Sequence, residues 1–167
     1  DLNSYKALSD LLDMAKVIAD PEGDHDLAYA LKLTNFIKRK IPTLPSSIVL
    51  NQLYWQAMKF EAPHRFESFL LYMEKNRSPK KRFYQPRAKT LHVVVEDLQN
   101  LEDGLIEFYG LSLPPRVGKS TVCIFFLAWC VGRHPDLHNA MGGHSGILAK
   151  GFYKEFLNLI TSPEYTY

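Results

Sequence analysis

A Gly-Lys-Ser-Thr sequence at residues 118–121, set between two apolar segments, constrains the fold of this chain more than any other feature. The run before it, 106–113, is short and apolar, as in a buried strand. The stretch after it, 122–131, is apolar on all sides, as in a helix that other elements cover. The order strand, loop, helix predicts the opening of a parallel α/β sheet.

The residue types in this loop suit the binding of a triphosphate. Gly118 lets backbone N–H groups approach phosphate oxygens, Lys119 offers an ammonium group, and the Ser120 hydroxyl can ligate Mg²⁺. The helix that follows directs the positive end of its dipole at the same anion. The full pattern has a further glycine where this chain has Leu113, so a chance surface turn is the alternative interpretation.

Charge is distributed unevenly along the 167 residues. The net charge of +2 is too small to indicate a nucleic-acid partner by itself. Residues 1–30 carry seven acids against two lysines, whereas residues 75–89 carry seven cations and no acid. The basic stretch could contact DNA phosphates, steer ATP, meet a neighbouring subunit or form a solvated loop, which is the default interpretation.

Apolar spacing predicts helices throughout residues 1–75, and a further helix from Pro86 that Gly104 ends. A second, weaker strand is expected at 138–143, before a last helix capped by Ser145. We therefore expect an α/β chain: a helical segment at 1–75, then the incomplete start of a P-loop NTPase sheet at 76–167. No apolar run is long enough to span a bilayer.

From Phe66 onward the chain resembles the large terminase subunit of tailed bacteriophages, the ATP-driven motor that packages viral DNA. The matching segments include Phe83-Tyr84-Gln85-Pro86-Arg87, residues 98–104 and Leu111–Thr121, and they continue to Tyr165. Terminases commonly carry a variant Walker A loop that has an arginine near the Gly-Lys pair and lacks the first glycine. Arg116 would fill that role here.

The resemblance implies ATP and Mg²⁺ as cofactors, with Arg116 and Lys119 as the catalytic residues and Ser120 as the Mg²⁺ ligand. It also implies an adenine-reading role for Gln85, whose amide matches adenine N6 and N7; a helix cap is the alternative. Tyr84 could stack on the base or pack in the core. The nucleotide-binding residues would be Tyr84, Gln85, Arg87, Val117, Gly118, Lys119, Ser120 and Thr121.

The same resemblance implies partners and a location. The partners would be double-stranded DNA, the small terminase subunit, the portal and further copies of the chain, without a membrane. The location would be the bacterial host cytoplasm, transiently at the procapsid. The acids for hydrolysis and the nuclease domain are expected beyond Tyr167, so we expect this piece to hydrolyse ATP weakly or not at all. A docking module and a helicase-like ATPase unconnected with phage are the alternatives.

Three further patterns have plain structural interpretations. Residues 91–97 imitate a metal-binding strand that ends in acids, but their spacing favours a helix. Ser145 lies in an incomplete nucleophile-elbow pattern and is expected to cap a helix. Cys130, His134 and His138 have the spacing of metal ligands, but Pro135 interrupts any shared helix and a fourth ligand is not evident.

Overall fold

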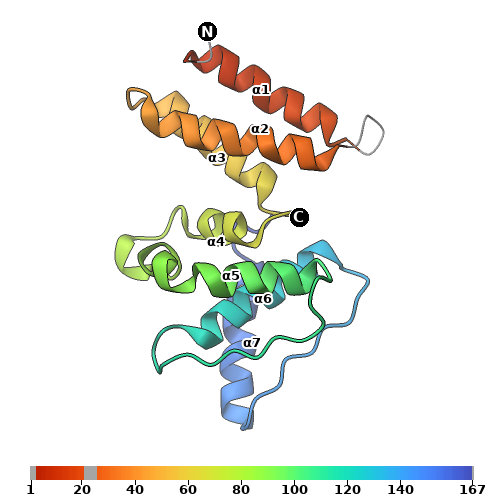
Figure 1. Ribbon diagram of the computed structural model, residues 1–167. Coiled ribbons are helices and arrows are strands. Elements are labelled where there is room, and N and C mark those ends of the chain that lie inside the picture. Colours follow the sequence, from red (N-terminus) through yellow and green to blue (C-terminus); the bar gives the residue numbers. More distant parts are fainter. Residues whose placement is uncertain (1–2, 21–25, 167) are drawn as a thin grey trace. The chain divides into compact units, whose positions relative to one another are not determined.

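A computed structural model describes residues 3–20 and 26–166 of the chain. These residues form seven α-helices, and the chain divides into two compact units, residues 1–62 and residues 63–167 (Figure 1). The division falls earlier than the end of the helical segment expected at 1–75. Helix α4 (Phe66–Glu74) consequently belongs to the second unit, where it packs on α5 and α6.

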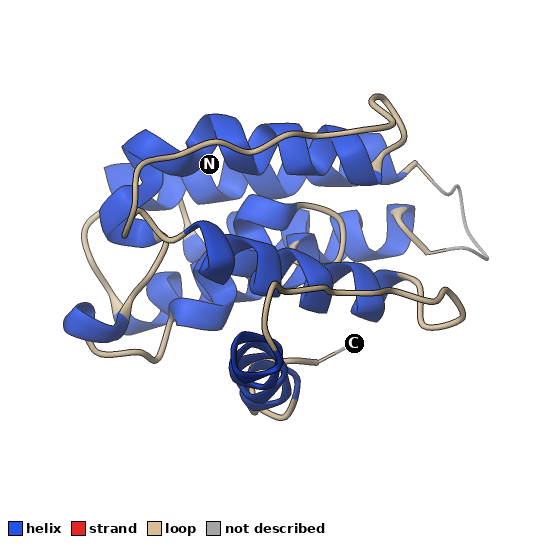
Figure 2. Ribbon diagram, turned by 90° about the horizontal axis from the view of Figure 1, so that it is seen from below, coloured by secondary structure: helices blue, strands red, loops and turns tan. Residues whose placement is uncertain are grey.

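The predicted α/β fold is wrong, because the described residues contain helices and loops but no strand (Figure 2). Segments 106–113 and 138–143, both predicted as strands, are irregular. A strand is stabilised by backbone hydrogen bonds to a neighbouring strand, and neither segment has such a neighbour among the described residues. Phe108 is 85% exposed, so this apolar run is not buried as a central strand would be.

The first unit is built from α1 (Tyr5–Ile18), α2 (Leu27–Lys40) and α3 (Ile48–Glu61). A polar side chain caps the start of each helix by accepting a hydrogen bond from a backbone N–H of the first turn; the caps are Ser4, Asp26 and Ser47. The apolar faces meet in one core that contains Leu8, Leu12, Ile37, Leu50, Leu53 and Ala57. The apolar spacing therefore predicted these helices correctly.

The second unit contains α4, three longer helices and two short 3₁₀ turns. Helix α6 packs against α4 and α7, and α4 packs against α5. Gly104, at φ +72°, follows α5 and ends it, as expected. The elements after α4 are the turns Pro79–Lys81 and Gln85–Arg87 and the helices α5 (Ala88–Glu102), α6 (Lys119–Arg133) and α7 (Gly146–Ile160).

Aromatic rings surround α6 and explain why its sequence is apolar on every side. The ring of Trp129 lies 5.3 Å from that of Phe66, and the ring of Phe125 lies 6.3 Å from that of Phe69. From Thr121 to Arg133 every residue of α6 is buried or half-buried. The burial expected for this helix is thus confirmed, but helices cover it instead of a sheet.

Hydrogen exchange tests the absence of strands. We expect the amides of residues 106–113 to exchange rapidly, because the structure gives them no backbone partner, whereas amides in the middle of α6 are protected. NMR or mass spectrometry of the folded chain measures the exchange rates of residues 106–113 and of α6 in one experiment. Protection of alternate amides within 106–113 would show a strand and contradict the structure.

Candidate functional site

The loop before α6 ends in a left-handed turn at Gly118, which is the N-cap of the helix at φ +102°. Lys119 is the first helical residue, and the first intrahelical bond runs from the Val122 N–H to the Gly118 carbonyl at 3.0 Å. The first N–H groups of a helix lack intrahelical acceptors, and the helix dipole makes this end positive. The predicted phosphate loop therefore does lead directly into the N-terminus of a helix.

The Lys119 side chain folds back over the loop. Its Nζ donates a hydrogen bond to the Leu113 carbonyl at 2.8 Å, which closes the segment between them. Arg116 is exposed and has a left-handed backbone at φ +66°, a conformation that is uncommon outside glycine. Ser120 is exposed, whereas Val117 and Thr121 are half-buried. Two residues with left-handed backbone, Arg116 and Gly118, thus lie in one short loop that carries an arginine, a lysine and a serine.

The ring of Phe83 lies against the backbone of Gly118. A Cβ atom at Gly118 would overlap the Phe83 Cε2 atom and lie 3.2 Å from two further ring atoms. Glycine is therefore required here for two reasons, the positive φ and the aromatic ring. This contact joins residues 83–87, called here the aromatic-Gln segment, to the loop at Gly118 through Phe83 and not through Tyr84.

A buried carboxylate from α4 holds the aromatic-Gln segment in place. Glu74 is 2% exposed, and its oxygens accept hydrogen bonds from the backbone N–H groups of Phe83, Tyr84 and Gln85 at 2.5, 2.7 and 3.2 Å. The sequence interpretation missed this residue. The sequence does contain a signal for it, because Glu74 shares the apolar helical face of Leu70 and Met73. An acid on a buried face needs hydrogen-bond partners.

Three of the residues predicted to bind the nucleotide, Tyr84, Gln85 and Arg87, lie in different surroundings. Tyr84 is fully buried, and its Oη donates to Glu67 at 2.6 Å, so it packs in the core, one of the two roles considered for it. Gln85 is exposed, and its Oε1 accepts a hydrogen bond from Arg82 at 2.5 Å. The exposed Arg87 donates to the Phe83 carbonyl at 3.0 Å.

Two lookalike patterns have the structural roles expected of them. Residues 91–97 lie within α5, where Leu91, Val94 and Val95 are buried and Glu96 is exposed. Ser145 is the N-cap of α7 and accepts a hydrogen bond from the Leu148 N–H at 3.3 Å.

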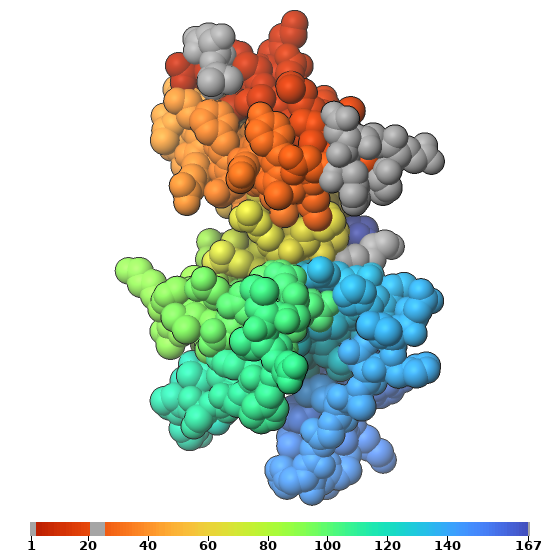
Figure 3. Space-filling model, turned by 45° about the vertical axis from the view of Figure 1, so that its right-hand side comes forward, coloured from red at the N-terminus to blue at the C-terminus, as the bar shows by residue number. Residues whose placement is uncertain are grey.

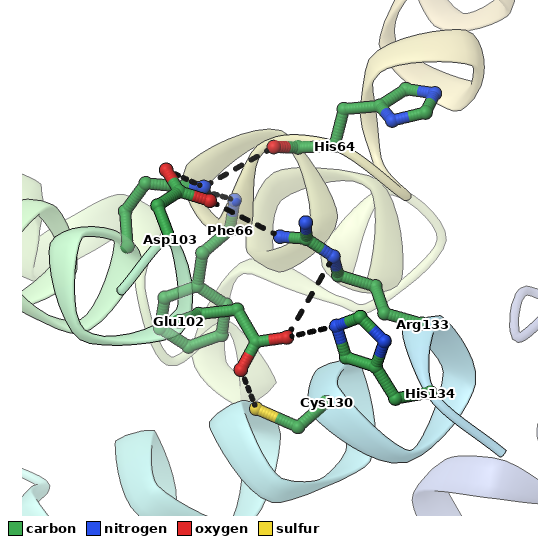
Figure 4. A network of polar contacts seen from close by, with 8 residues as sticks. His64, Phe66, Glu102, Asp103, Cys130, Arg133 and His134 are labelled. Carbon is green, nitrogen blue, oxygen red and sulfur yellow. Dashed lines mark hydrogen bonds and ion pairs between the residues drawn. The ribbon is translucent and has the colours of Figure 1, made fainter. Parts of the chain in front are cut away.

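A polar network joins the ends of α5 and α6 around Glu102 (Figure 4). The Cys130 thiol donates to one carboxylate oxygen at 3.1 Å, and His134 Nε2 lies 2.9 Å from the other. Burial, together with this carboxylate, raises the pKa of Cys130, so the thiol keeps its proton. Among the described residues no group of three or more His, Cys, Asp or Glu side chains could hold a metal ion, and His138 lines a separate, mainly apolar cavity.

Comparison with protein-family models, with curated proteins and with solved structures found no match to this chain. None of the helices in the described part of the chain combines the length and the apolar character needed to cross a membrane. The resemblance to terminases therefore depends on the motif residues themselves.

Substitution of the two left-handed glycines tests the Phe83 contact. Gly104→Ala introduces backbone strain alone, because no atom lies within 4 Å of its Cβ position, and we expect a loss of about 1–2 kcal/mol. Gly118→Ala adds the collision with Phe83, so its loss should be larger by at least about 1 kcal/mol. Urea denaturation measures both losses. In the Gly118→Ala background, Phe83→Leu should recover part of the extra loss in the free energy of unfolding. Equal losses at the two glycines would contradict the contact.

The buried phenol of Tyr84 predicts a loss of stability in alkali. Burial, and next the hydrogen bond to Glu67, raise the pKa of Tyr84, so the folded state holds this proton more tightly than the unfolded state does. The resulting stabilisation is complete below the unfolded pKa of about 10 and is lost as the pH rises above it. The free energy of unfolding should then fall less steeply between about pH 10 and 11 in Tyr84→Phe than in wild type. Tyr153→Phe, at a 64% exposed ring, is the control and should keep the wild-type slope.

Proposed function

We propose that this chain is the ATP-binding portion of a DNA-packaging motor of the large terminase type. The observation that carries the proposal is the left-handed turn at Gly118, which places Lys119 at the start of a 15-residue helix with Phe83 of the aromatic-Gln segment beside it. The proposal depends on this loop and on the motif resemblance.

Each loop residue has a stated role in the proposal. The phosphates replace the Leu113 carbonyl as the partner of the Lys119 ammonium, which is 2.8 Å from that carbonyl in the free chain. The backbone N–H groups of residues 118–121 donate to phosphate oxygens, and the Ser120 hydroxyl ligates Mg²⁺. The exposed Arg116 contacts the γ-phosphate, where a positive charge stabilises the transition state of phosphoryl transfer.

The wider function is proposed by resemblance. Hydrolysis would drive the translocation of double-stranded DNA into a capsid, with the small terminase subunit, the portal and sister subunits as partners in the bacterial cytoplasm. Acids that hold Mg²⁺ and activate water are also required for that chemistry. We propose that nucleotide binding is the contribution of this chain.

Docking is a second candidate function, favoured by exposed apolar side chains of the second unit. Phe108 is 85% exposed, Ile147 is 87% exposed and Tyr153 is 64% exposed. Large apolar side chains that remain in water are typical of surfaces that another protein covers when they form a contiguous patch. Both functions can reside in the same chain.

Titration with a fluorescent ATP analogue, with and without Mg²⁺, tests the nucleotide proposal. We expect saturable binding by the wild-type chain and at least about tenfold weaker binding by Lys119→Ala, because one charge-assisted contact is lost. Lys89→Ala removes an exposed lysine outside the loop and should bind as the wild type does. Ser120→Ala should lose the Mg²⁺-dependent part of the affinity.

Circular dichroism must first show that every variant is folded. If the folded wild type does not bind the analogue, or if Lys119→Ala binds it equally well, the nucleotide proposal fails. Docking would then be the remaining candidate function.

A further inference from the structure

A groove of about 410 Å³ in the second unit is lined by five positively charged side chains among its twelve residues. It lies between the loop that follows α4, the N-terminal half of α6 and the last turns of α7; Figure 3 shows the yellow-green segment of that loop projecting from the surface. We call it the basic groove. Five cations face a single carboxylate, that of Glu155; they are Arg77, Lys80, Lys81, Arg82 and Arg87. The described residues that line it include neither Lys119 nor Ser120.

Within residues 3–20 and 26–166, no carboxylate forms an ion pair with the cations of the basic groove. By contrast, the guanidinium of Arg133, at the end of α6, pairs with two carboxylates. Its Nε lies 3.8 Å from Glu102 Oε1, and its Nη1 lies 3.7 Å from Asp103 Oδ1. Like charges gathered around a concave surface repel one another and create a positive potential that attracts anions.

Two guanidinium groups of the basic groove are held in place before any ligand arrives. Arg82 donates from Nε to the Arg77 carbonyl at 3.1 Å and from Nη1 to Gln85 Oε1 at 2.5 Å. Arg87 donates from Nη1 to the Phe83 carbonyl at 3.0 Å. A fixed guanidinium keeps further N–H donors for a ligand and loses little entropy when it binds one.

The geometry points to a binding site for a small molecule that carries two or more phosphoryl groups. The volume of the basic groove is that of a small-molecule site, and Thr121 and Asn158 add neutral hydrogen-bond donors to its lining. Phosphate oxygens accept several charge-assisted hydrogen bonds at once, which matches the fork geometry of arginine. This inference does not rest on the binding of a nucleotide at Gly118.

Inorganic tripolyphosphate is a suitable probe because it carries the charge without a base or sugar. Calorimetric titration of the folded chain should show saturable binding that weakens as salt is added. The double variant Lys80→Gln/Lys81→Gln should bind at least about tenfold more weakly, since two cations are removed. Lys89→Gln should retain wild-type affinity, Lys119→Ala should retain the saturable site that the double variant weakens, and Glu155→Gln should bind more tightly because the one facing carboxylate is neutralised.

Three outcomes would overturn the inference. They are no saturable binding to the wild type, equal binding by the double variant, and loss of binding in Lys119→Ala alone, which would assign the anion to the loop at Gly118. Duplex DNA is titrated in parallel. If DNA binds through Lys80 and Lys81 and tripolyphosphate does not, the basic groove is a surface for nucleic acid and the small-molecule inference is wrong. Since Lys80 and Lys81 are exposed, circular dichroism of the double variant should match that of the wild type.

Discussion

The second unit depends on one buried carboxylate. Removal of a carboxylate from water costs several kcal/mol unless hydrogen bonds replace its hydration. Glu74 obtains those bonds from three consecutive backbone N–H groups at residues 83–85. The chain therefore has to turn at this point, and the turn sends Phe83 towards Gly118 and Tyr84 into the core. Glu74 of α4 thus connects the core to the loop that precedes α6.

The same turn explains why helix α6 can be apolar on every side without a sheet. Phe83 stacks on Phe125 from one direction, with ring centroids 5.9 Å apart, while Phe66 and Phe69 of α4 contact the helix from another. Aromatic side chains bury large areas, so a few rings are enough to enclose a helix. A sequence that is apolar on all sides establishes that a helix is covered, but the covering element can be a sheet or other helices.

The sequence predicted local structure well and long-range pairing poorly. Helical spacing and the cap at Ser145 are decided within a few residues, and both are found as predicted. The strands at 106–113 and 138–143 required partners elsewhere in the chain, and an apolar run does not reveal whether such partners exist. Glu74 was missed for the same reason, because its partners lie about ten residues away and on backbone atoms.

The positive charge of the loop after α4 follows from how the nearby acids are used. Glu74 points inward to backbone N–H groups, and Glu67 accepts from the phenol of Tyr84. These two carboxylates bind groups of the second unit, and neither lies within ion-pair distance of the cations at residues 77–87. Salt screens such a cluster only in part where it lines a concave surface, so a bound anion is the arrangement that removes most of the repulsion.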